Sequence, residues 1–266
     1  TNLNDAPTGS VTISGTSTED QTLTASNTLA DSDGLGSITY QWQRDGVDIG
    51  SATNATYTLG DADVGAVITV VASYTDGQGT AESVTSAATA AVANLNDAPT
   101  GSVTISGTAT EDQTLTASNS LADNDGLGVI SYQWQRDGVD IGSATNSTYT
   151  LTDNDVGTVM TVVAAYTDGQ GTAESVTSSA TAAVTNLNDA PTGSVTISGT
   201  ATEDQTLTAS NTLADSDGLG SITYQWQRDG VDIGSATNST YTLGDSDVGA
   251  VITVVASYTD GQGTAE

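Results

Sequence analysis

The chain has 266 residues, of which 33 are Asp or Glu and only three are basic, and it contains no His and no Cys. Its formal net charge of −30 favours cations as partners and disfavours nucleic acids and anionic membranes, which attract basic surfaces. Disulfides and thiolate metal sites are excluded, and the usual nucleophile–base pairs of enzymes are missing. We therefore expect a protein that is not an enzyme and that makes no direct membrane contact.

The segment NLNDAPTG occurs three times, beginning at Asn2, Asn94 and Asn186, so the repeat is 92 residues long. The first and third copies differ at only three of their 82 shared positions. A unit of this length can bury its own core, and Pro and Gly mark NLNDAPTG as a linker. The prediction is three domains in a row, over residues 1–92, 93–184 and 185–266.

Alternation of apolar and polar residues predicts strands in every copy. In chain order the alternating segments of the first copy are SVTISG, TLTASNTL, ITYQW, AVITVVASYTD and SVTSAATAAV. The last of these carries Val84, Ala88, Ala90 and Val92 in step, which predicts one continuous strand. The third copy stops before its counterpart of this segment, so we expect it to be less stable or to be completed by another chain.

The order of features resembles an immunoglobulin-like domain: a Trp in a mid-chain strand, an RDG turn, the short segments VDIG and TYTL, a DVG turn and a strand ending in Tyr. The predicted fold is all-β, with three tandem Ig-like or cadherin-like antiparallel β-sandwich domains in an elongated array. Trp42, Tyr40, Leu23, Ile68 and Val70 are expected to form the core. No signal peptide or long apolar run is present, so we expect a soluble piece from the interior of a larger protein.

Each copy has the same eleven acidic positions, while the residue between paired acids varies, as in DADVG, DNDVG and DSDVG. In an immunoglobulin-like sandwich, the linker, the second-to-third strand loop and the last hairpin loop share the N-terminal end. The first loop and the loop before the penultimate strand share the C-terminal end. Most acids should therefore gather where one copy ends and the next begins.

Clustered carboxylates repel each other unless a cation neutralises them, and Ca²⁺ prefers 6–8 oxygen ligands. We predict that Ca²⁺ binds at each junction, with more than one ion per junction. The acids that this topology brings to the first junction are Glu19, Asp61, Asp63, Asp97, Asp123, Asp125 and Asp168. Their counterparts at the second junction are Glu111, Asp153, Asp155, Asp189, Asp215, Asp217 and Asp260. Whether Asp20, Asp112 and Asp204 are ligands is left open.

The linker NLNDAP resembles that of cadherin repeats, where Asp-x-Asn-Asp-Asn before Ala-Pro binds calcium between successive domains. This resemblance adds Asn94 and Asn96 beside Asp97, and Asn186 and Asn188 beside Asp189, as calcium ligands. The sequence departs from the cadherin pattern by an Asn at the first linker position, by one residue fewer before the Pro, and by DAD in place of Asp-Arg-Glu.

All three copies are similar to the tandem extender repeats of giant bacterial RTX adhesins, which are secreted by the type I pathway. The resemblance implies an extracellular, cell-surface location with a role in adhesion and biofilm. It also implies a monomeric rod, stiffened by Ca²⁺ between neighbouring repeats, that projects a distal ligand-binding domain.

Other interpretations of the same residues remain open. Asp-Gly pairs are common turn residues, and Asp63 could form an ion pair with Arg44 instead of binding a metal. The repeats could themselves bind carbohydrate, ice or a host surface, for which a flat Thr array or exposed aromatic residues would be the signature. The many Thr residues show no short-period ordering in the sequence.

Overall fold

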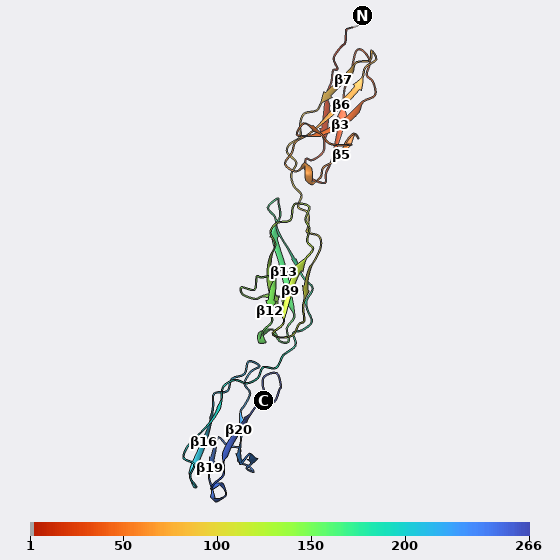
Figure 1. Ribbon diagram of the computed structural model, residues 1–266. Coiled ribbons are helices and arrows are strands. Elements are labelled where there is room, and N and C mark those ends of the chain that lie inside the picture. Colours follow the sequence, from red (N-terminus) through yellow and green to blue (C-terminus); the bar gives the residue numbers. More distant parts are fainter. Residues whose placement is uncertain (1–2) are drawn as a thin grey trace. The chain divides into compact units, whose positions relative to one another are not determined.

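The computed structural model describes residues 3–266, so Asn2, the first residue of the first linker copy, lies outside the described residues. The described chain consists of short antiparallel strands and three single-turn 3₁₀-helices, which confirms the predicted all-β sandwich fold (Figure 1). None of the helices among residues 3–266 is long and apolar enough to cross a membrane.

The first two copies contain the same elements in the same order, and the third has the same order without the last strand. Those of the first copy are β1 (Val11–Ser14), β2 (Thr22–Asn27), β3 (Thr39–Arg44), β4 (Val47–Asp48), β5 (Thr56–Thr58), η1 (Asp61–Asp63), β6 (Ile68–Thr75) and β7 (Ala81–Thr85). Those of the second are β8 (Val103–Ser106), β9 (Thr114–Asn119), β10 (Ser131–Arg136), β11 (Val139–Asp140), β12 (Thr148–Thr150), η2 (Asp153–Asp155), β13 (Met160–Thr167) and β14 (Ala173–Thr177). Those of the third are β15 (Val195–Ser198), β16 (Thr206–Asn211), β17 (Thr223–Arg228), β18 (Val231–Asp232), β19 (Thr240–Thr242), η3 (Asp245–Asp247) and β20 (Ile252–Ser257).

Each copy has two sheets. In the first copy the strand orders are β1-β2-β5 and β4-β3-β6-β7, and in the second they are β8-β9-β12 and β11-β10-β13-β14. The third copy has β15-β16-β19 and the three-stranded sheet β18-β17-β20. The contacts within the chain divide it into two compact units. The first comprises residues up to 102, 120–130 and 165–176. The second comprises residues 103–119, 131–164 and 177–266. The predicted domain boundaries stay a prediction.

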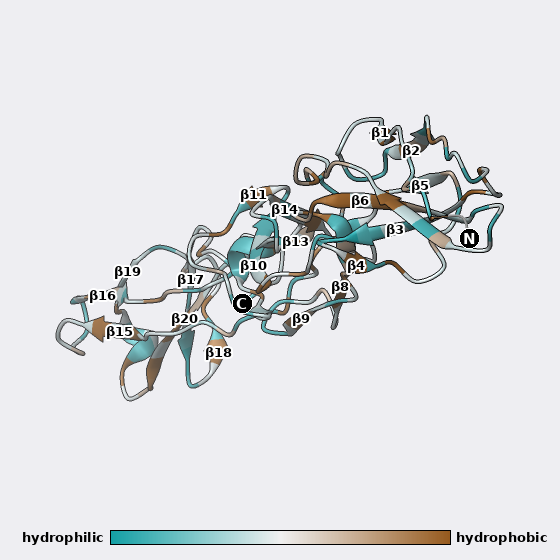
Figure 2. Cartoon of the chain, turned by 90° about the horizontal axis from the view of Figure 1, so that it is seen from above, coloured by the Kyte–Doolittle hydropathy of each residue, from teal (hydrophilic) through white to brown (hydrophobic). Residues whose placement is uncertain are grey.

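The core of each copy lies between the inward faces of its two sheets. In the first copy Leu23 from β2 and Trp42 from β3 are completely buried, together with Ile68 and Val70 from β6. Figure 2 shows β6 as one of the more hydrophobic strands. The Trp42 indole N–H donates to the carbonyl of Asn54 at 2.9 Å, so this large side chain is buried with its polar group satisfied. Alternation in the sequence therefore predicted the core correctly.

The last segment of the copy is not the single strand that the alternation predicted. Strand β7 ends at Thr85, and Ala88 and Ala90 are exposed, whereas Val92 is buried. Residues 86–93 run beside β6. The N–H groups of Ser86, Thr89 and Val92 donate to the carbonyls of Val70, Ile68 and Ala66, respectively. The donors are three residues apart, whereas the acceptors are two residues apart. The extra residue in each interval breaks the period of two.

Hydroxyl groups complete the ladder where this segment departs from strand geometry. Ser86 Oγ accepts from the Val70 N–H and Thr89 Oγ1 accepts from the Ile68 N–H, both at 3.0 Å. The second copy repeats both contacts, from Val162 to Ser178 and from Met160 to Thr181. No polar group at this edge of β6 is therefore left without a partner over residues 68–70.

The same arrangement of Arg, Asp and Tyr closes the C-terminal end of each copy. Asp63 is 1% exposed; its Oδ1 accepts from Arg44 Nε at 2.7 Å, and its Oδ2 accepts from the Tyr57 hydroxyl at 2.8 Å and the Gly60 N–H at 3.0 Å. Asp155 makes the equivalent contacts with Arg136 and Tyr149. The structure thus shows the ion pair that was the alternative to metal binding for these aspartates.

Removal of this carboxylate should destabilise the sandwich. We expect the triple variant D63A/D155A/D247A to lose about 3 kcal/mol per repeat, because the Arg remains without its partner; the figure lies at the low end for buried pairs since the Arg side chains are about one-third exposed. Urea unfolding followed by fluorescence of the single Trp in each repeat measures the loss. The matched control D48A/D140A/D232A changes exposed aspartates and should stay within about 0.5 kcal/mol. Equal midpoints for the two triple variants would contradict this assignment.

Candidate metal centre

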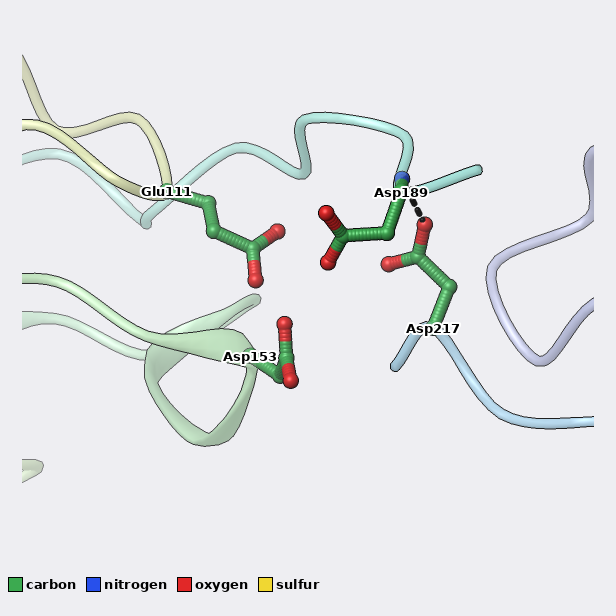
Figure 3. A group of neighbouring side chains, drawn as sticks. All are labelled: Glu111, Asp153, Asp189 and Asp217. Carbon is green, nitrogen blue, oxygen red and sulfur yellow. Dashed lines mark hydrogen bonds between the residues drawn. The ribbon is translucent and has the colours of Figure 1, made fainter. Parts of the chain in front are cut away.

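Four carboxylates from separate segments converge on one point in the second compact unit (Figure 3). Glu111 comes from the loop between β8 and β9, Asp153 from η2, Asp189 from the linker, and Asp217 from the loop between β16 and β17. Each offers one oxygen, and these oxygens all lie within 4.8 Å of one another. The cluster thus joins the C-terminal end of the second copy to the linker and to the β16–β17 loop of the third.

An equivalent cluster lies in the first compact unit. Glu19, Asp61 and Asp97 bring their oxygens within 4.8 Å of one another in the same way. Asp125, the counterpart of Asp217, is close enough to raise the pKa of Glu19 by its charge. The sorting of acids by topology therefore predicted which loops meet at both clusters.

The backbone of the linker holds the glutamate of each cluster in place. Glu19 N–H donates to the carbonyl of Ala93, and the Leu95 N–H donates to Glu19 Oε2 at 3.3 Å. Glu111 makes the same two contacts, with Thr185 and Leu187. Each glutamate is only 1% exposed, so the chain that leaves a copy runs directly over a buried carboxyl group.

Burial and like charge dominate the electrostatics of both clusters. Burial, followed by a hydrogen bond with Asp61, raises the pKa of Glu19 from 4.5 to about 7. The pKa of Glu111 is also raised to about 7, by burial and then by its hydrogen bond with Asp153. Burial and the charges of Asp153 and Asp217 raise the pKa of Asp189 as well. Two carboxylates 4.8 Å apart repel by about 3 kcal/mol at an effective dielectric constant of about 20, so the ionised clusters require a counter-charge.

Several buried oxygens in the clusters and in the linkers lack a hydrogen-bond partner. These are Glu19 Oε1 in the first cluster, Asp217 Oδ1 in the second, and Asn94 Oδ1 and Asn186 Oδ1 in the linkers. A buried acceptor without a donor is costly. The unpartnered oxygens of Asn94 and Asn186 belong to the first linker position, which the cadherin resemblance marks as a ligand. Their lack of a partner supports a ligand position in the linker, and this support does not depend on the acidic cluster.

The structure does not bring the remaining predicted ligands into the clusters. Both oxygens of Asp63 and of Asp155 are engaged by the Arg, Tyr and backbone donors described above. The side-chain amides of Asn96 and Asn188 donate to Glu174 at 2.8 Å and Glu266 at 2.9 Å, respectively. Asp20, whose backbone has a φ of 60°, is exposed beside the buried Glu19.

Asp168 and Asp260 occupy the last hairpin loop at the N-terminal end of their copies. Asp168 Oδ1 accepts from the N–H groups of Gln170 and Thr172, whereas its Oδ2 is buried without a partner. Burial by itself would raise the pKa of Asp168, but these backbone donors keep it below the usual value. Asp260 has the same surroundings. Neither belongs to the groups whose oxygens converge among the described residues.

Asp123 and Asp215 have their oxygens committed elsewhere. Asp123 Oδ2 accepts from the Tyr166 hydroxyl at 2.5 Å, and its Oδ1 accepts from the Asp125 N–H at 2.9 Å. Asp215 accepts from Tyr258 and from the Asp217 N–H in the same way. Only the second Asp of each Asp-x-Asp pair therefore faces its cluster. The sequence analysis missed the Tyr, although Tyr-Thr-Asp at the end of the strand recurs in all three copies.

The donor set fits a hard divalent cation. The oxygens of Glu111, Asp153, Asp189 and Asp217, with the unpartnered Asn186 oxygen nearby in the linker, are carboxylate and amide oxygens of the kind that Ca²⁺ binds. The chain has no His or Cys, so the nitrogen and sulfur ligands that zinc and copper prefer are absent from the whole sequence.

A second surface is defined by hydroxyl groups, which the sequence analysis treated as scattered. On the first copy the outward face of β1-β2-β5, with the residues that extend these strands, consists only of exposed Ser and Thr: Ser10, Thr12, Ser14, Thr22, Thr24, Ser26, Thr28, Thr56 and Thr58. We call this surface the hydroxyl face. Cross-strand neighbours approach each other, as between Thr22 and Thr58 at 3.0 Å. The absence of ordering in the sequence was therefore misleading, because the strand register creates the order.

Comparisons with known proteins assign no family. No protein-family profile and no curated protein matches the chain. Among solved structures, a Ca²⁺-stabilized adhesin that helps an Antarctic bacterium reach out and bind ice is 15% identical, with a TM-score of 0.30, over 99% of this chain and 72% of that one.

Two further similar structures are also adhesins. A tetra-tandem repeat in the extending region of a large adhesion protein is 19% identical, with a TM-score of 0.33, over 98% and 73% of the two chains. A structure from a 1.5-MDa bacterial ice-binding adhesin is 15% identical, with a TM-score of 0.28, over 99% and 96%.

Protonation of the clusters should govern the stability of the calcium-free chain. The folded pKa of Glu19 and Glu111 is about 7 against 4.5 for the unfolded group, so their contribution to stability is full below pH 4.5 and is lost as the pH rises through 7. The lowered pKa values of Asp76, Asp168 and Asp260 act oppositely and remove stability only in stronger acid, below about pH 4. We therefore expect a higher melting temperature at pH 5 than at pH 8.

Thermal unfolding followed by circular dichroism, after complete metal removal, measures this difference. The variant E19Q/E111Q should lose most of it, because glutamine does not titrate. The control E82Q/E174Q changes glutamates that lie outside both clusters and should behave as the wild type does. A wild-type chain that melts at the same temperature at pH 5 and pH 8 would contradict the prediction.

Proposed function

We propose that this chain is a structural extender from a bacterial surface adhesin, located outside the cell, and that Ca²⁺ at the junctions between repeats stiffens it. The observation that carries the proposal is the convergence of Glu111, Asp153, Asp189 and Asp217 within 4.8 Å, with Asp217 Oδ1 buried and unpartnered. Two of these carboxylates belong to the end of one repeat, and two belong to the linker and to the second-to-third strand loop of the next.

This division of the ligands gives a mechanism. Without a cation the carboxylates repel, so the linker favours arrangements in which the two groups of acids separate. A bound cation replaces the repulsion by attraction to both groups and so fixes the angle between consecutive repeats. The buried glutamate also anchors the departing chain through the Leu187 N–H, which places the stiffened point at the linker itself. A stack of such repeats would hold a distal binding domain away from the cell surface.

The proposal predicts a calcium-dependent change in both dimension and stability. We expect calcium to increase the maximum dimension in small-angle X-ray scattering, because flexible linkers become straight. The melting temperature should rise as well, by mass action; a ligand at 100 times its dissociation constant contributes about 2.7 kcal/mol. Measurements in calcium and in chelator at equal ionic strength provide the comparison.

The double variant E111Q/D153N should weaken the calcium-dependent change in dimension and melting temperature at one junction. The control is D137N, which changes an aspartate in the turn between β10 and β11. A maximum dimension and a melting temperature that are both unchanged between calcium and chelator would rule out the calcium-stiffened extender.

The hydroxyl face favours a second candidate function, in which the repeats themselves bind a neutral surface such as a carbohydrate or ice. It carries no charge in a chain of net charge −30, and its hydroxyl groups follow the register of three strands. We expect any such binding to be abolished by T24K/T116K/T208K, which places a large charged side chain at the centre of the face in every copy. Glycan arrays and ice-affinity partitioning of the wild-type chain test this candidate, with T69K/T161K/T253K on the other sheet as the control.

A further inference from the structure

A line of hydrogen bonds connects a buried tyrosine to each carboxylate cluster. In the second unit the Tyr258 hydroxyl donates to Asp215 Oδ2, and Asp215 Oδ1 accepts from the Asp217 N–H at 2.9 Å. Asp217 Oδ2 in turn accepts from the Asp189 N–H at 2.8 Å (Figure 3). In the first unit the same line runs from Tyr166 through Asp123 and Asp125 to Asp97.

Each step of this line fixes the next residue. Tyr258 directly follows β20 and is 6% exposed, so burial and the hydrogen bond to Asp215 fix the position of its hydroxyl. The hydroxyl orients the Asp215 carboxylate, which holds the Asp217 backbone by its N–H. Asp217 is also 6% exposed, and its Oδ2 holds the linker while its Oδ1 stays buried and free of donors. The position of the free oxygen thus depends on a side chain that is not itself near the cluster.

We infer that Tyr166 and Tyr258 are positioning residues for the two cation sites, and that Asp123 and Asp215 support Asp125 and Asp217 instead of binding the ion. The inference rests on the proposed function, since it concerns how the same sites are assembled. It reassigns the first aspartate of each Asp-x-Asp pair from ligand to support. Residues that orient metal ligands through hydrogen bonds commonly change metal affinity by about 10–100-fold when they are removed.

The first copy contains a natural control. Tyr74 donates to Asp31 Oδ2 at 2.6 Å, Asp31 Oδ1 accepts from the Asp33 N–H at 2.8 Å, and Asp33 Oδ2 accepts from the Asp5 N–H at 2.8 Å. Tyr74 is 5% exposed, as Tyr166 is, and its hydroxyl makes the same hydrogen bond to an aspartate as those of Tyr166 and Tyr258. None of these residues belongs to the groups of converging carboxylates found among residues 3–266. Loss of the Tyr74 hydroxyl therefore has the structural cost without an effect on either cluster.

The test is isothermal titration of the whole 266-residue chain with calcium chloride, for wild type, Y166F/Y258F and Y74F. We expect Y166F/Y258F to bind calcium about tenfold more weakly, and Y74F to bind as the wild type does. Urea unfolding should show similar destabilisation per substitution in both variants, because each loses the same buried hydrogen bond. In the calcium-free state, the NMR resonances of the Asp217 and Asp189 amides should shift in Y166F/Y258F and stay unchanged in Y74F.

Substitution of the aspartate separates support from direct binding. Asn at position 215 keeps an acceptor for the Asp217 N–H and can donate to the Tyr258 oxygen, so D215N should retain most of the affinity that D215A loses. If Asp215 bound the ion directly, D215N and D215A would lose equal calcium affinity, and loss of the Tyr258 hydroxyl would not weaken calcium binding. Either result would overturn the inference. If the wild type binds calcium and Y166F/Y258F binds it with the same affinity, the positioning role is overturned and the proposed function stands. If the wild type binds no calcium, the proposed function is overturned as well.

Discussion

Repulsion between carboxylates gathered around a buried glutamate is the constraint on which the rest of this structure depends. Glu19 and Glu111 are 1% exposed, and a carboxylate oxygen of each lies within 4.8 Å of an aspartate oxygen. A fold does not gain stability from such an arrangement by itself. The surroundings nevertheless hold it in place, through backbone donors from the linker and through the tyrosine-anchored aspartates. The arrangement has the donor set that a hard divalent cation binds.

The placement of charge elsewhere follows from the same constraint. The buried aspartate of each 3₁₀-helix forms an ion pair with an Arg of the same repeat, so its charge is neutralised inside the repeat. These aspartates are Asp63, Asp155 and Asp247. The hydroxyl face carries no acid, and the acids are concentrated in loops and in the linker. The chain can therefore be strongly acidic while the hydrophobic core of each sandwich contains no acid.

The sequence was a good guide wherever one period or one topology decided the outcome. Alternation identified Leu23, Trp42, Ile68 and Val70 as core. The order of loops predicted the segments of the four converging carboxylates, but it also predicted Asp155, Asp215 and Asp260, which do not converge with them. The sequence failed as a guide where a side chain took over the role of backbone. Residues 86–93 looked like a strand because their apolar residues alternate, but Ser86 and Thr89 complete the ladder with hydroxyls and allow an extra residue in each interval. Likewise, the sequence could not separate Asp215 from Asp217, since only the direction of each carboxylate distinguishes a support from a ligand.

The hydroxyl-completed ladder has a consequence for chains with many similar copies. Adjacent repeats of nearly identical sequence can exchange strands during folding, and such misassembly is a characteristic failure of tandem arrays. An open strand edge would be the natural place for the exchange to begin. Ser86 and Thr89 occupy both the donors and the acceptors of β6 at residues 68–70 with groups from their own repeat. The feature that spoiled the alternation thus closes this edge of β6, and the same edge of β13 in the second copy, to a strand from another repeat.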